Sequence, residues 1–136
     1  PEHFNRIYRN RTPEGPQGRE LEREILGIDH TELGALYLHN HHLPDVLIDT
    51  ARYHHEPERA GHHGQVIAAV QIANLLVRHA EIGFSGDAEP ASEEQCLAAT
   101  GWGILFPNQT ESEQAITRAN WQRSLDRFPT ILEGLV

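Results

Sequence analysis

The 136-residue sequence contains no methionine, no lysine and a single cysteine, Cys96. One cysteine excludes an internal disulfide, which fits a reducing compartment, so we expect a cytoplasmic protein. Long apolar runs are absent too. No stretch approaches the roughly 20 residues of a membrane-spanning helix, and no signal peptide opens the chain. Because the chain begins with Pro1, we interpret it as a piece of a longer polypeptide.

Positive charge is also scarce. The eleven basic residues, all arginine, face twenty acidic ones, which gives a formal net charge of −9. Nucleic acids and anionic membranes are bound by basic surfaces, so we expect neither as a partner. The length and the hydrophobic content of 38% fit one globular domain with a modest core.

Apolar residues recur at helical spacing, and no segment alternates with period two for long enough to predict a strand. The spacing predicts helices at roughly 19–26, 30–42, 44–55 and 65–82. We expect a short helix after Ser92 and a last one from Thr110 to about Phe128. The predicted fold class is therefore all-α, a helical bundle.

Local signals set the ends of these helices. Gly27 and Gly83 are typical C-terminal stops, Pro44 suits a first helical turn, and Pro57 limits the third helix. Three pairs with the spacing of a capping box predict helix starts: Asp29 with Glu32, Ser92 with Gln95, and Thr110 with Glu113. The segment 9–18, rich in proline and glycine, is predicted to be an exposed, mobile loop.

The periodic apolar faces predict the core. The side chains expected to be mostly buried are Leu33, Leu36, Leu47, Ala51, Val66, Val70, Ala73 and Val77.

Histidine is unusually abundant, with ten residues. Those in "HNHH" (39–42) and "GHHG" (61–64) fall in turns or at helix ends, where solvated surface is the ordinary interpretation. His30, His54 and His55 differ, because His30 begins one predicted helix while His54 and His55 end the next. If these two helices pack antiparallel, the three imidazoles lie at the same end.

Such a cluster has two interpretations, a metal site or a polar network. Imidazole is the commonest nitrogen ligand of metals, so His30, His54 and His55 are candidate metal positions. Asn74 points partly inward on the fourth predicted helix and would need polar partners nearby. The same residues would equally form a hydrogen-bonded polar network without metal. Spacing alone leaves both open.

Several motifs together resemble a known family. "LEREILGIDHTELGALYLHNHHLPDVLIDTARYHHEP", then "VIAAVQIANLLVR" and "IGFSGDAEP", are similar to the C-terminal half of an HDOD domain, a bacterial signalling module related to the HD phosphohydrolases. The resemblance runs from about Glu20 to Pro90 and includes the Ser85–Gly86 turn. It implies an HDOD-like part at 1–90 and a helical extension at 91–136.

The resemblance also bears on chemistry. In catalytic relatives, several histidines, a His-Asp doublet and a final aspartate hold divalent metals that activate water. His30, His54 and His55 stand at the later histidine positions, and Asn74 replaces the aspartate. The doublet is absent from this chain, and "ERAGHHG" stands where a DGxGYP signature would follow. The resemblance thus implies a degenerate metal site; we expect no cofactor, with iron, manganese or zinc as the alternative.

Two functional hypotheses follow. We favour a non-catalytic signal-output module that binds a protein partner or a neighbouring domain, with homo-oligomerisation left open. The alternative is a metal-dependent phosphohydrolase, a nucleotide or cyclic-dinucleotide phosphodiesterase whose remaining ligands lie upstream.

Overall fold

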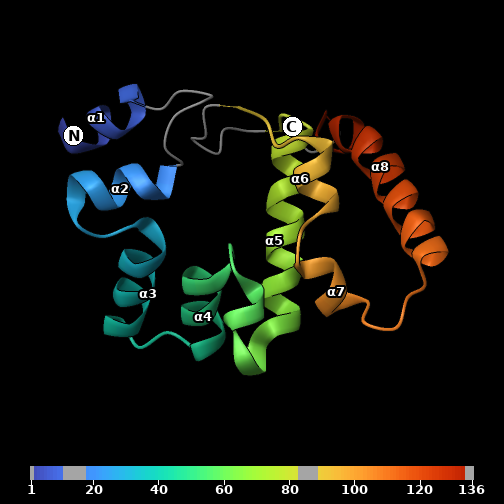
Figure 1. The fold of residues 1–136 in the computed structure, drawn as a ribbon. Coiled ribbons are helices and arrows are strands. Elements are labelled where there is room, and N and C mark those ends of the chain that lie inside the picture. Colours follow the sequence, from blue (N-terminus) through green and yellow to red (C-terminus); the bar gives the residue numbers. More distant parts are fainter. Residues whose placement is uncertain (1, 11–17, 83–88, 134–136) are drawn as a thin grey trace.

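The computed structural model describes residues 2–10, 18–82 and 89–133, and within these ranges it is helical with no β-strand. This confirms the all-α fold class. Helix α5 runs through the middle of the molecule, with α1 to α4 on one side and α6 to α8 on the other (Figure 1). None of the helices in the described part of the chain has the length and hydropathy to cross a bilayer.

The four helices predicted at 19–26, 30–42, 44–55 and 65–82 are present, with ends within a few residues of the predicted ones. The bounds of the helices are α1 Glu2–Asn10, α2 Gly18–Leu26, α3 His30–Asn40, α4 Asp45–Tyr53, α5 Gly64–His79, α6 Glu93–Leu97, α7 Gly101–Leu105 and α8 Glu111–Glu133, with short 3-10 helices at η1 Pro57–Arg59 and η2 Gly61–His63.

The expected helix boundaries are confirmed where they depend on local signals. Gly27 adopts a φ of +76° after α2, a left-handed conformation that glycine accepts without strain. Ser92 and Gln95 form a reciprocal capping box at α6. Pro44 instead stands one residue before the first turn of α4.

The loop prediction needs correction at both edges. Arg9 and Asn10 belong to α1, and Gly18 is the first residue of α2. The short apolar face of α1 had not been recognised as helical, yet its Ile7 is buried. Residues 11–17, Gly83 and the Ser85–Gly86 turn lie outside the described residues.

The core prediction was wrong for most of its members. Leu33, Leu36, Leu47, Val66, Val70 and Ala73 are exposed, and Ala51 and Val77 are half-buried. The buried face of α5 consists instead of Ile67, Ala68, Ile72 and Leu76. Because α5 is apolar around most of its circumference, a stripe of valines and a stripe of larger side chains both fit helical spacing. The stripe with isoleucine and leucine faces inward.

A second packing layer joins α5 to the C-terminal helices. Trp102 packs with Ile72 and Leu76, and its indole N–H donates to the Cys96 carbonyl oxygen at 2.7 Å. The Cys96 thiol is buried and lies 3.6 Å from the Leu75 carbonyl oxygen. Trp121 of α8 meets Trp102 edge-on, with ring centroids 5.7 Å apart.

Helix α7 approaches α5 closely at Gly101. The Gly101 amide donates to the Gln71 side-chain oxygen at 2.9 Å. A Cβ atom at Gly101 would lie 2.9 Å from the Ala68 carbonyl oxygen, closer than such contacts occur. Absence of a side chain at this position therefore sets the spacing between the two helices.

Candidate metal centre

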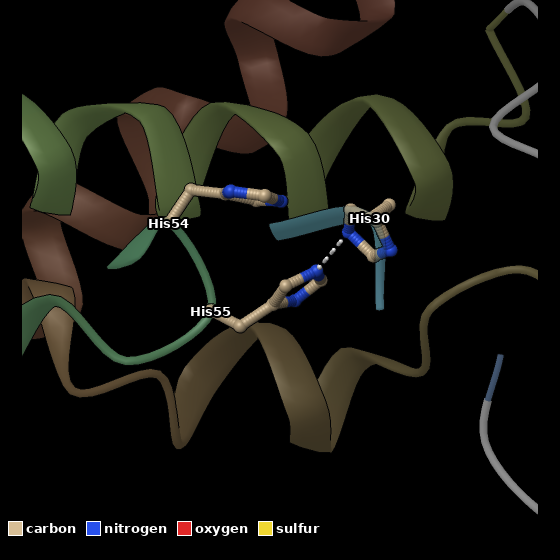
Figure 2. Close-up of side chains that lie close together, drawn as sticks. All are labelled: His30, His54 and His55. Carbon is tan, nitrogen blue, oxygen red and sulfur yellow. Dashed lines mark hydrogen bonds between the residues drawn. The ribbon is translucent and has the colours of Figure 1, made fainter. Parts of the chain in front are cut away.

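Helices α3 and α4 pack as an antiparallel pair and bring three histidines to one end. His30 is the first residue of α3, while His54 and His55 directly follow α4. Figure 2 shows the three imidazoles turned toward one another. The sequence placed the three side chains at a common end, and the structure brings them together there.

The rings are close enough to share a ligand. The His30 ring centroid lies 5.5 Å from that of His54 and 5.2 Å from that of His55, and the last two are 4.2 Å apart. One nitrogen from each ring can be chosen so that all three lie within 4.8 Å of one another.

His30 is oriented by a carboxylate. Its Nδ1 lies 2.7 Å from a Glu22 oxygen on α2, and its backbone N–H donates to the same oxygen at 2.8 Å. An ionised carboxylate only accepts, so Nδ1 of His30 carries a proton, and in the neutral tautomer of this ring Nε2 holds a lone pair. Nε2 of His30 lies 3.1 Å from Nε2 of His55, and in that tautomer the His55 nitrogen is the donor.

His54 is oriented by backbone carbonyls in the same way. Its Nδ1 lies 3.1 Å from the Thr50 oxygen and 3.0 Å from the Ala51 oxygen in the last turn of α4. Carbonyl oxygens accept, so this Nδ1 carries the proton and Nε2 keeps its lone pair. Carboxylates and backbone carbonyls are the partners that commonly orient metal-binding histidines.

The environment of His54 and His55 keeps these two rings neutral. Burial lowers the pKa of His55 to about 3, with further contributions from His54, His30 and Arg19. Burial also lowers the pKa of His54, against the raising effect of its carbonyl contacts. Neutral imidazole is the form that binds a metal, so these rings would be competent ligands at neutral pH.

The donor set fits a nitrogen-binding transition metal. Ligand nitrogens 2.0–2.1 Å from a tetrahedral zinc ion lie about 3.3 Å apart, near the His30–His55 separation of 3.1 Å. His55 would have to move its proton from Nε2 to Nδ1. The group that converges here, among the described residues, contains only histidines. It therefore suits zinc or ferrous iron better than magnesium or calcium, which prefer oxygen.

The remaining predicted site residue is placed less clearly. Asn74 is half-buried on α5, but in the described part of the chain its side chain forms no hydrogen bond to any of the three histidines. Its role as a replacement for an aspartate ligand stays a prediction.

Two contributors were missed at the sequence level. Glu22 orients His30, and Gln71 donates to the His55 carbonyl oxygen at 3.0 Å. Both reach the site from helices separate in sequence, and no spacing rule links them to it. His63, expected at the surface, is half-buried with its Nδ1 2.8 Å from Asp49. His39, His41, His42 and His62 are exposed, as expected.

Beside the histidines, Asp29 ties α2 to α3. The Asp29 carboxylate caps α3 by accepting from the Thr31 and Glu32 amides, at 2.9 and 3.0 Å. It also meets Arg19 at 3.1 Å and Arg23 at 2.6 Å. Burial alone would raise the Asp29 pKa, but the bonds from Thr31, Glu32 and Arg19 outweigh it and hold that pKa well below its usual range. The cap was predicted; the arginines were not.

The HDOD domain family model matches residues 1–57. The match confirms the resemblance over that segment, which contains His30, His54 and His55; the part of the resemblance from 58 to 90 lies beyond it. Comparisons with curated proteins and with solved structures gave no significant match.

Proposed function

We propose that the chain is a signal-output module that acts by contact with a protein partner or a neighbouring domain rather than by catalysis. The HDOD match supports a role in signalling. The net charge of −9 favours a protein partner over nucleic acid or an anionic membrane.

The exposed aliphatic side chains carry this proposal. Leu33 and Leu36 on α3 are 51% and 49% exposed, Leu47 on α4 is 46% exposed, and Val66 on α5 is 50% exposed. Single exposed apolar residues are common, whereas a contiguous group of them marks a surface that binds another protein, and we propose that these four side chains belong to such a surface. These residues had been expected inside the fold, because their spacing is that of a buried face.

The histidine cluster favours a second candidate, a metal-dependent phosphohydrolase. Glu22 orients the His30 ring and backbone carbonyls orient the His54 ring, so that Nε2 of each can serve as a ligand when the ring is neutral. A bound metal would supply Lewis-acid activation of water. The converging group lacks a carboxylate, so the charge of a divalent ion would be poorly compensated. We therefore place metal binding second, with no residue of this chain assigned a catalytic role.

The partner hypothesis can be tested with one charged substitution. Leu36→Asp places a carboxylate on an exposed apolar position of α3, and Asn40→Asp adds the same charge at an exposed polar position of that helix. In proximity labelling, we expect partners of the unaltered protein to be lost with Leu36→Asp and kept with Asn40→Asp. Equal labelling by both variants, with circular dichroism unchanged, would contradict the proposed contact surface.

The phosphohydrolase candidate needs a separate measurement. The protein is loaded with zinc, manganese or ferrous iron and assayed on a phosphodiester and a cyclic dinucleotide. We expect no turnover. Turnover that disappears in a His54→Ala variant would establish the second candidate instead.

A further inference from the structure

Four arginines line one pocket beside the histidine cluster. The pocket has a volume of about 390 Å³ and is formed by α2, α3, the end of α4 and η1. Arg19, Arg23, Arg52 and Arg59 contribute to its wall. Four of the eleven basic residues of an acidic chain thus gather around one cavity.

Carboxylates offset this charge only in part. Asp29, next to the pocket, binds Arg19 and Arg23, and Glu56 meets Arg59 at 2.9 Å and Arg19 at 3.8 Å. Glu32 is the remaining acidic group of the wall. Four guanidinium groups therefore face three carboxylates, a local excess of one positive charge where the whole chain has a net charge of −9.

Arg52 has no structural partner. In the part of the chain that the structure describes, it forms neither an ion pair nor a hydrogen bond, although it lines the pocket. Arg19 and Arg23 have an evident structural role in holding Asp29, but Arg52 has none. A guanidinium with five free donors at the wall of a pocket is available to a ligand.

Another part of the pocket wall is held in place. The Arg59 guanidinium lies over the Tyr53 ring, 5.9 Å from its centroid, while one of its nitrogens bonds Glu56. This stacking restricts a long side chain that would otherwise be mobile. Arg59 is thus positioned before any ligand arrives, which reduces the entropy lost on binding.

We propose that this pocket binds the phosphoryl group of a small phosphorylated ligand. Planar guanidinium groups bind phosphate oxygens in pairs, and phosphate offers more acceptor oxygens and more charge than a single carboxylate. The volume lies within the usual range of small-molecule sites, about 300–1,000 Å³, which leaves room for a group attached to the phosphate.

The site is distinct from the three histidines, although one stretch serves both. In "RYHHEP", Arg52, Tyr53 and Glu56 line the pocket, while His54 and His55 form the cluster. The proposal does not depend on partner binding or on metal. It adds a small-molecule ligand to the module, at a site separate from the histidines of the phosphohydrolase candidate.

The test is isothermal titration of the whole chain with inorganic phosphate and, separately, with adenosine monophosphate, at low ionic strength. We expect both to bind the unaltered protein. Arg52→Gln should weaken binding about tenfold or more, because it removes a charge and a paired donor. Arg52→Lys keeps the charge and should recover only part of the loss.

The matched control is Arg6→Gln, which removes the same charge from an exposed arginine on α1 that is not part of this pocket. It should leave the affinity unchanged. Tighter binding of the nucleotide than of phosphate would indicate that the attached group is also held; equal binding would assign recognition to the phosphoryl group alone. No saturation at millimolar phosphate by the unaltered protein, or equal losses in Arg52→Gln and Arg6→Gln, would overturn the proposal.

Discussion

Asp29 carries more interactions than any other carboxylate described above, because it both caps α3 and binds two arginines. Asn is as good an N-cap as Asp, so Asp29→Asn retains the cap and removes the charge. We expect it to lower the free energy of unfolding by about 1–3 kcal/mol, measured by urea denaturation. Asp45→Asn, at an exposed first turn of α4, should cost less than about 1 kcal/mol. Equal effects would mean that the arginine contacts contribute little.

His55 predicts a pH dependence of stability. Its pKa is about 3 in the folded chain, against an ordinary value of 6.5. Between these values the unfolded chain binds the proton and the folded chain does not. The free energy of unfolding should therefore fall as pH is lowered from about 6.5 toward 3, and burial of His54 acts in the same direction.

The measurement is the urea midpoint at pH 7.5 and pH 5. His55→Asn should reduce the difference between the two midpoints, because asparagine does not titrate. His39→Asn, at an exposed position of α3, should leave the difference as it is. A His55→Asn variant with the full pH dependence would show that other groups dominate.

At the scale of the helices, the contact between α5 and α7 depends on Gly101. A methyl group there would meet the Ala68 carbonyl oxygen, a backbone atom that cannot rotate away. Gly101→Ala should lower the free energy of unfolding by about 1–3 kcal/mol. Gly103 lies in the same helix with nothing within 4 Å of an added Cβ. Gly103→Ala should therefore be neutral or stabilise by up to about 1 kcal/mol, in the same thermal or urea unfolding assay.

Helix ends were predictable because their signals are local. Ser92 with Gln95, and Thr110 with Glu113, make the expected bonds at α6 and α8. Asp29 also caps α3 as expected, but its carboxylate forms ion pairs with two arginines of α2 as well. Capping depends on residues within one turn, whereas the arginine contacts depend on how α2 is oriented against α3.

At the scale of the whole molecule, the effect of a substitution in α5 depends on whether the residue faces the core. Ile72 is 1% exposed and Val70 is 36% exposed, two residues apart on the same helix. Ile72→Asp should unfold the domain, since an unpaired buried charge is very costly. Val70→Asp, which the periodicity alone would have marked as unfolding, should cost less than about 1 kcal/mol. Circular dichroism with thermal unfolding distinguishes the two, and a folded Ile72→Asp variant would contradict this core.

The candidate site was partly predictable for a related reason. The meeting of His30 with His54 and His55 follows from a short connection between two helices, which forces them to pack antiparallel. Glu22, Gln71 and the pocket at Arg52 depend on contacts between elements far apart in the sequence. No periodicity encodes these contacts, so only the folded arrangement reveals them.

The single thiol gives the folded chain a natural reporter of its own opening. Cys96 is buried against α5, and burial raises the pKa of its thiol, so little reactive thiolate is present at neutral pH. Because the sulfur is buried, we expect a disulfide reagent to react with it slowly until α6 moves away from α5. The labelling rate, followed as urea is added, would therefore measure the free energy of that local detachment separately from global unfolding. Because the sequence has no second cysteine and no methionine, one sulfur atom accounts for the whole signal.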